Sequence, residues 1–372
     1  MEKPADVLDI IFAKAQQHLS KTFIRDGEIL KRAEFVSRNI QNRAGVRLLM
    51  SCLLAKIVNP KIDIRKPYTE IDSKDCFSGR TYDEAYIGSF IVKHHLPCNS
   101  TTAFLTPALR NRNITLTPKV NLVGRPSEVY QYGLDLLDYV HRQAIQPELL
   151  LAEVIRQLIV LRDENQKRMK SLLKNLGETG SVALSGEDII NLIKQHLNCK
   201  GTSRLPVLIV AAAYRTIAAC IREKILPLQS HNSADKQTGA LGDLQITLKD
   251  KNNIVTSYEM KMKKVTIDDI DIALQKIGTA RYKIDNYIFI TTDVIEDAVN
   301  EYAKSLYEQT GGVEIVILDC ISFLRHFIHL FHRFRVQYLE EYQKLVMAEP
   351  DSAVSQYLKE AFLALRQSAE SS

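Results

Sequence analysis

A carboxylate and lysine ammonium groups alternate with apolar residues in SYEMKMKK, residues 257–264. Read with the two-residue period of a β-strand, Glu259, Lys261 and Lys263 share one face, and Tyr258, Met260 and Met262 lie on the other. A charged row of this kind has two interpretations. It is either the solvated face of an edge strand or a site that handles a negatively charged substrate such as a phosphodiester.

A second stretch, DLQITL at residues 243–248, alternates in the same way, with Asp243 and Gln245 on its polar face. If the two strands pair as a hairpin, Asp243 and Glu259 adjoin, and two neighbouring carboxylates form an oxygen-rich site for Mg²⁺. The metal would bind the scissile phosphate and lower the pKa of a bound water. Lys261 would orient that water or stabilise the charge that develops on the phosphate. Asp243 and Glu259 are thus the expected metal ligands and, with Lys261, the expected catalytic residues.

Two other polar residues are candidates for outer contacts to the same site. Gln245 follows Asp243 by two residues and could line the site. Glu223 lies in CIREKI, on the helix expected before the hairpin, where it could orient a water molecule. Glu223 fits a solvated helix position equally well.

The hydrophobic pattern predicts a helical first half and an alternation of helices and strands after about residue 200. The expected helices of the first half cover residues 4–23, 42–59, 128–143, 147–178 and 185–199. The expected elements of the second half are a helix at 203–225, strands at 242–250 and 253–264 joined by a turn at 249–253, a helix at 266–282, a strand at 285–293, a helix at 294–312, a strand at 313–319, and helices at 320–347 and 352–367. This order predicts an α/β fold with a mixed sheet core flanked by helices.

Between the early helices, residues 63–126 are polar, aromatic and rich in Pro, Gly, Ser and Thr. A long irregular segment in a compact domain is usually functional or disordered, and its many apolar residues argue against disorder. Its basic and amide side chains could contact phosphates and base edges, which predicts a DNA-binding segment. The other interpretation is an irregular, salt-bridged surface loop. The candidate DNA-binding residues are Arg65, Lys66, Arg80, Asn99, Arg110, Asn111, Arg112 and Arg125, together with Lys263 on the charged strand.

Asp243 followed by Glu259-Met260-Lys261 resembles the signature of the PD-(D/E)xK nuclease superfamily, although Gly242 stands where that signature has proline. Residues 63–111 resemble a stretch of SacI-like type II restriction endonucleases. Together the resemblances imply a restriction-endonuclease-like core at 201–372 with C-terminal helices, preceded by a mostly helical region at 1–200 that contains the DNA-recognition segment. They imply a Mg²⁺-dependent homodimer that cuts double-stranded DNA at a short palindrome, GAGCTC in that family.

Composition is compatible with these expectations without establishing them. The chain has 372 residues and a formal net charge of +5, which permits a polyanionic partner. The six cysteines form no C-x-x-C pair, and no run is long and apolar enough to span a membrane, so we expect a cytoplasmic protein. Two alternatives stay open: a repair or junction-processing nuclease of the same fold, and a non-catalytic DNA-binding protein with a degenerate nuclease core.

Overall fold

The computed structural model divides into two compact units, Met1–Arg168 and Met169–Ser372. The boundary along the chain falls within the long helix α7 (Pro147–Glu178). The predicted division at residue 200 differs from this one, because α8 (Gly186–Leu197) packs into the core of the second unit. The predicted fold class is confirmed: a helical N-terminal half precedes an α/β half with a five-stranded mixed sheet. The structure describes residues 3–99, 101–110, 112–178, 183–228, 241–250, 253–280 and 283–371.

The first unit is built from helices around α3, in which every residue from Ala44 to Ala55 is buried. Helix α2 (Gly27–Arg38) is not among the predicted helices, and its first turn is capped by the Asp26 carboxylate. The elements of this unit are α1 (Pro4–Gln17), α2, α3 (Ala44–Val58), the short helices η1 (Thr69–Ile71), α4 (Gly79–Tyr82), η2 (Asp83–Ile87), α5 (Gly88–Lys93) and η3 (Ala103–Leu105), α6 (Glu128–His141) and the first part of α7.

The segment at 63–126 is an ordered part of this unit. Its apolar side chains, among them Ile64, Leu109 and Leu116, are buried in the common core. Its backbone is fixed by the buried carboxylate of Asp83. This carboxylate accepts hydrogen bonds from the Arg47 guanidinium, the Thr102 hydroxyl and the Ala103 backbone amide. Disorder is therefore excluded for the described residues of the segment, as its composition predicts.

The sheet of the second unit has the strand order β1-β2-β3-β4-β5. Its strands are β1 (Glu223–Ile225), β2 (Leu244–Leu248), β3 (Ile254–Lys261), β4 (Asn286–Thr291) and β5 (Glu314–Asp319). The first three strands are antiparallel and the last three are parallel, so β3 is central and carries both kinds of pairing. The interpretation of residues 257–264 as a solvated edge strand is therefore wrong.

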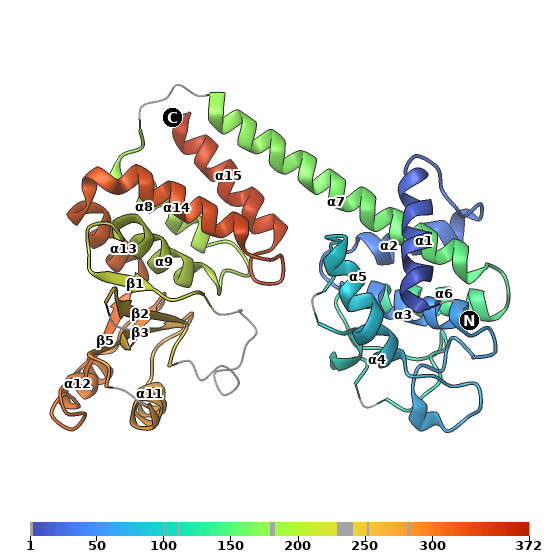
Figure 1. Ribbon diagram of the computed structural model, residues 1–372, viewed down its shortest axis with the longest axis horizontal. Helices are drawn as coiled ribbons and strands as arrows, with labels where there is room; N and C mark the ends of the chain where they lie inside the picture. The colour runs from blue at the N-terminus through green and yellow to red at the C-terminus, as the bar shows by residue number, and fades with distance from the viewer. Residues whose placement is uncertain are drawn as a thin grey trace. The chain divides into compact units, whose positions relative to one another are not determined.

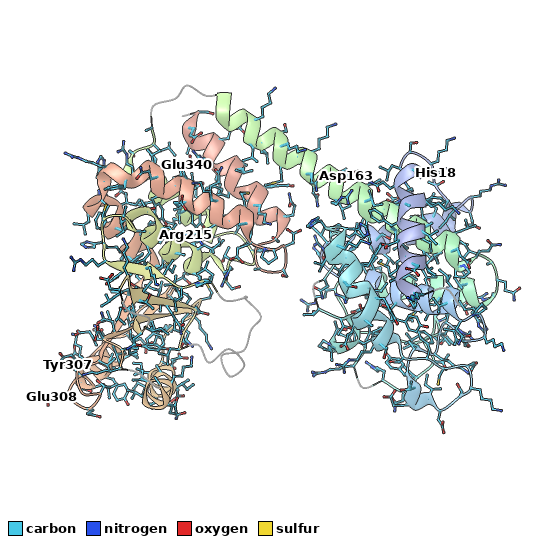
Figure 2. The ribbon with its side chains drawn as sticks, in the orientation of Figure 1. His18, Asp163, Arg215, Tyr307, Glu308 and Glu340 are labelled. Atoms are coloured by element: carbon cyan, nitrogen blue, oxygen red, sulfur yellow. The ribbon has the colours of Figure 1, made fainter. Side chains whose placement is uncertain are left out.

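Helices cover both faces of this sheet, as Figure 1 shows. On one face, β2 and β3 contribute Leu244, Ile246 and Tyr258 to a core shared with α8, α9 (Leu205–Ile217), α13 (Cys320–Leu330), α14 (Arg335–Ala348) and α15 (Gln356–Glu370). On the other face, Tyr287 and Phe289 pack with α11 (Ile267–Thr279) and α12 (Asp297–Ser305). Figure 2 labels Arg215 and Glu340 in the first layer, and Tyr307 and Glu308 just after α12 in the second.

Three predicted helices of this unit are wrong in extent, and one of them, expected at 294–312, spans only Asp297–Ser305. The helix expected at 203–225 ends at Ile217, because the chain then pairs with the edge of β2, with Leu226 donating to the Gln245 carbonyl. This tertiary pairing outweighs the helix propensity of the segment. The helix expected at 320–347 is broken around the short helix His332–Phe334, and the break lets the rings of Phe327 and Tyr338 pack 5.4 Å apart.

Among the described residues, no helix is both long and apolar enough to cross a bilayer. All six cysteines are free thiols.

Candidate active site

Asp243 and Glu259 lie side by side at one end of the β2–β3 pair. Leu244 pairs with Tyr258 across the two antiparallel strands, so the residue before Leu244 lies opposite Glu259. The Asp243 carboxylate also accepts a hydrogen bond of 2.7 Å from the backbone amide of Met260. The predicted juxtaposition of these two carboxylates is therefore present in the structure. The turn predicted between the strands includes residues 251 and 252, which lie outside the described residues.

Three donors surround the Glu259 carboxylate. The Lys261 ammonium lies 2.9 Å from Oε1, and the Lys276 ammonium lies 2.9 Å from Oε2. The Tyr287 hydroxyl donates to the same Oε2. Glu259 is 14% exposed and Lys261 is 21% exposed, so water has only limited access to the cluster. The cluster is a partly desolvated, charged site beside the exposed Asp243.

Helix α11 supplies the rest of this cluster. Its N-terminus is fixed by a capping box between Thr266 and Asp269. The other oxygen of Asp269 lies 2.9 Å from Lys261, so one carboxylate both caps the helix and orients the ammonium. Lys276 lies seven residues, or two turns, after Asp269, which places both side chains on the helix face toward β3.

The protonation states follow from these contacts. Burial alone would raise the pKa of Glu259, but hydrogen bonds from Tyr287, Lys276 and Lys261 outweigh it and hold the pKa below its ordinary value. Burial would lower the pKa of Lys261, but hydrogen bonds to Glu259 and Asp269 outweigh it and raise the pKa. At neutral pH the site therefore contains a carboxylate and a protonated amine. Lys261 is suited to stabilising negative charge and not to removing a proton.

Gly242, directly before Asp243, makes the close approach of the two strands possible. A Cβ atom at this position would lie 2.5 Å from the Tyr258 carbonyl oxygen and 2.7 Å from the Ser257 hydroxyl. Any residue with a side chain, proline included, would push this part of the chain away from β3. Gly242 therefore holds Asp243 against the strand that carries Glu259.

Buried polar atoms continue the site along the same strands. Gln245 pairs with Ser257 in the sheet, and Ser257 pairs with Tyr287 on the next strand. The amide nitrogen of Gln245 and the hydroxyls of Ser257 and Thr247 are buried and make no hydrogen bond to any residue that the structure describes. Gln245 thus shares the face of Asp243, as predicted, although that face is largely buried. Buried polar groups without a partner are uncommon in folded proteins.

Glu223 is not part of this cluster. It belongs to β1 and not to a helix, and it pairs with Leu248. It lines a pocket with Tyr214 and Tyr258, whose side chain lies on the opposite sheet face from that of its neighbour Glu259. The interpretation of Glu223 as a helix residue near the metal ligands is wrong for that reason. Lys263 is exposed, two residues beyond the end of β3.

The candidate DNA-binding residues of the first unit form two groups. In the first, carboxylates of the same unit already bind the basic groups: Arg65 pairs with Asp63 and Asp138, Lys66 with Asp75, and Arg80 with Glu84. In the second, Arg110 and Arg125 are exposed and Arg112 is half-buried, and none of the three pairs with a carboxylate in the described part of the chain.

The two amide candidates differ in what the structure describes. The carbonyl of Asn99 accepts from the buried guanidinium of Arg47, at 2.6 Å, so its backbone has a structural role. Its side-chain amide donates to Thr101 at 3.5 Å. Asn111 lies outside the described residues.

Three residues of this site could not be identified from the sequence pattern of the two strands. Lys276, Asp269 and Tyr287 come from α11 and β4, and only the fold brings them to Glu259. One signal was present in the sequence: Asp269 and Lys276 have the seven-residue spacing of one helix face, directly after the charged strand.

The carboxylates present fit magnesium better than zinc. Magnesium is held by one or two carboxylates together with waters and substrate phosphates, whereas structural and catalytic zinc sites use three or four protein ligands. Over the residues that the structure describes, no group of three or more His, Cys, Asp or Glu side chains could hold a metal ion. Asp243 and Glu259 would be the protein ligands, and waters and a substrate phosphate would supply the others.

No protein-family model matches this chain, and no curated protein matches it either.

Proposed function

We propose that this protein is a Mg²⁺-dependent endonuclease that hydrolyses phosphodiester bonds in double-stranded DNA. The observation that carries the proposal is the position of Asp243 directly before the Leu244–Tyr258 pair, opposite Glu259, with Lys261 bound to Glu259 on the same strand face. Two adjacent carboxylates and one ammonium are the groups required to bind a divalent metal and a phosphate together.

Each residue has a role that follows from its surroundings. Asp243 and Glu259 would hold the metal, which when bound would polarise the phosphate and lower the pKa of a coordinated water. Lys261, kept protonated by Glu259 and Asp269, lies beside the metal ligands and stabilises negative charge on the phosphate. Gln245 lines the same strand face and offers an amide donor.

The first unit supplies the DNA contacts in this proposal. Arg110, Arg112 and Arg125 make no ion pair with a carboxylate of the described chain, which leaves their guanidinium groups available to phosphates or guanine edges. The resemblance of residues 63–111 to SacI-like restriction endonucleases extends the proposal to a homodimer that reads the palindrome GAGCTC. A palindrome is read by two copies related by two-fold symmetry, and cutting both strands needs two sites.

The test is a cleavage assay with charge-neutral variants. Wild-type protein should convert DNA to discrete fragments with MgCl₂ and leave it intact with EDTA. Asp243→Asn and Glu259→Gln should abolish cleavage, and Lys261→Met should slow it by about 100- to 1,000-fold, the usual effect of losing one electrostatic contact to the transition state. Asp297→Asn, Glu301→Gln and Lys304→Met on α12 remove the same charges away from the site and should cut normally.

The substrate tests the finer part of the proposal. Plasmids with and without a single GAGCTC site separate a restriction enzyme from a nuclease that cuts by DNA structure, because only the first would depend on that sequence. Sedimentation velocity should give a dimer. A protein that is monomeric both alone and on DNA, or that cuts branched DNA and ignores the palindrome, contradicts the restriction assignment and leaves the nuclease site standing.

A further inference from the structure

One phenol links the two segments that carry the proposed metal ligands. Tyr287, on β4, is fully buried, and its hydroxyl donates to Oε2 of Glu259. The same hydroxyl lies 2.9 Å from the carbonyl oxygen of Leu241, two residues before Asp243. Tyr287 therefore contacts Glu259 on one side and the chain that leads into Asp243 on the other.

Packing explains the ring of Tyr287 but not its hydroxyl. The centroid of its ring lies 5.3 Å from that of Phe289, in the core that packs against α11 and α12. A phenylalanine ring would fill this space equally well. A phenol hydroxyl has one proton, so it donates to either Glu259 or Leu241 at a given moment. The burial of a polar group that needs a partner indicates a role for the hydroxyl itself.

The other donors to Glu259 are less suited to fixing its position. Lys261 and Lys276 have flexible four-carbon side chains and are 21% and 20% exposed. Tyr287 is held on all sides by the core, and its hydroxyl has only a narrow range of positions. A rigid donor under a carboxylate sets the direction of the lone pairs that face outward.

We propose that Tyr287 is a positioning residue that sets the Glu259 carboxylate relative to Asp243 for divalent-metal binding. The inference rests on the nuclease function proposed above. When Glu259 directs its oxygens to a metal, the phenol can donate to the Leu241 carbonyl, so neither state leaves the buried hydroxyl unsatisfied. Tyr287 touches no substrate and no reacting atom in this account.

The experiment compares two tyrosine-to-phenylalanine variants. Tyr287→Phe removes the hydroxyl and keeps the ring. Tyr338→Phe is the matched control, because Tyr338 is also fully buried in this unit and its hydroxyl donates to the Ile209 carbonyl in the core on the other sheet face. The readout is Mn²⁺ binding to the DNA-free protein by titration calorimetry, with Glu259→Gln as the reference for lost binding. The Mg²⁺ concentration for half-maximal cleavage is measured in parallel.

Tyr287→Phe should bind Mn²⁺ about 10- to 100-fold more weakly than wild type, the usual effect of removing a group that orients a metal ligand. Its half-maximal Mg²⁺ concentration should rise in proportion, with a smaller change in rate at saturating Mg²⁺, and Tyr338→Phe should match wild type. Each titration is run at a temperature where circular dichroism shows the variant folded.

Three outcomes overturn the inference. Equal metal affinity in Tyr287→Phe and wild type refutes it and leaves the nuclease proposal intact. A Tyr287→Phe variant that folds at no temperature shows that the hydroxyl is a folding contact instead. A wild-type protein that neither binds Mn²⁺ nor cleaves DNA refutes the nuclease proposal, and the inference with it.

Discussion

Two ion-paired carboxylates, Asp83 in the first unit and Glu259 in the second, have contrasting surroundings. Asp83 is fully buried and all its hydrogen bonds come from the protein, with Arg47 on one oxygen and Thr102 and Ala103 on the other. Glu259 also has three donors, but it is partly exposed and adjoins the exposed Asp243. We call the Asp83 ion pair closed, because it is buried and all its contacts stabilise the fold. We call the Glu259 cluster open, because its side chains are partly exposed to solvent, where a ligand could reach them.

The same contrast separates the arginines of the first unit. Arg65 is 18% exposed and is bound by Asp63 and Asp138. Arg110 and Arg125 are exposed, and neither pairs with a carboxylate among the residues described. A basic side chain that its own fold has already neutralised contributes little to binding a polyanion. The neighbouring carboxylates therefore separate candidate DNA-binding arginines from structural ones, which residue type alone does not do.

The largest expected effect is on the closed cluster. Asp83→Ala should lower the free energy of unfolding of the first unit by about 3–5 kcal/mol, because it leaves the Arg47 guanidinium buried and unpaired. Urea unfolding followed by circular dichroism measures this loss. Asp75→Ala is the control in the same segment, where a solvated ion pair with Lys66 should contribute far less. Similar losses in both variants would show that Asp83 has no special structural role.

The next largest effect concerns the close approach at Gly242. Gly242→Ala should reduce cleavage by about 100-fold, because its Cβ would meet the Tyr258 carbonyl and displace Asp243 by a fraction of an ångström or more. Gly278→Ala on α11 is the control, since its Cβ would meet no atom within 4 Å and alanine favours a helix. Normal cleavage by Gly242→Ala would mean that the position of Asp243 does not matter to the reaction.

A smaller effect is expected at the unpaired arginines. Alanine at Arg110, Arg112 or Arg125 should weaken DNA binding with unfolding unchanged. A base contact would cost about 1–3 kcal/mol at one sequence position, and a phosphate contact would reduce the salt dependence by about one unit. Arg65→Ala should instead lower stability, because Asp63 and Asp138 lose their partner. Fluorescence anisotropy on cognate and mismatched duplexes, at several salt concentrations, distinguishes these results.

The smallest expected effect is on the pH dependence of stability. The pKa of Glu259 is lower in the folded protein than its ordinary value of 4.5, so its ion pairs contribute fully above that pH. This contribution is lost as the pH falls through the folded pKa. The difference in unfolding free energy between wild type and Glu259→Gln should therefore shrink below pH 4.5. A difference that stays constant down to pH 3 would show that the carboxylate is not stabilised by its neighbours.

Alternation of residue types predicted the strand half of the site, because period two fixes which side chains share a face. Asp243, Gln245, Glu259 and Lys261 lie on a common face for that reason. The helix α2 is absent from the prediction, although Ile29, Ala33 and Val36 have helical spacing after the Asp26 cap. The helix predicted at 185–199 is α8, which begins at a capping box formed by Ser185 and Asp188.

The remaining parts depend on long-range packing that a local pattern does not contain. Lys276 and Tyr287 reach Glu259 only because α11 and β4 cover and flank β3. Glutamate favours helices, but Glu223 lies in a strand because its segment pairs with the edge of β2. Residue type alone could not separate Arg65 from Arg110, since the difference lies in which carboxylates the fold brings near each one.

The most direct test of the open-versus-closed distinction measures folding and cleavage on one variant, Glu259→Gln. We expect an unfolding free energy within about 1 kcal/mol of wild type at neutral pH, since the amide keeps a similar shape and can accept from Tyr287. We also expect Mg²⁺-dependent DNA cleavage to be lost. A variant that unfolds readily would show that Glu259 is a folding contact, and one that folds and still cleaves DNA at the wild-type rate would show that Glu259 is not a metal ligand.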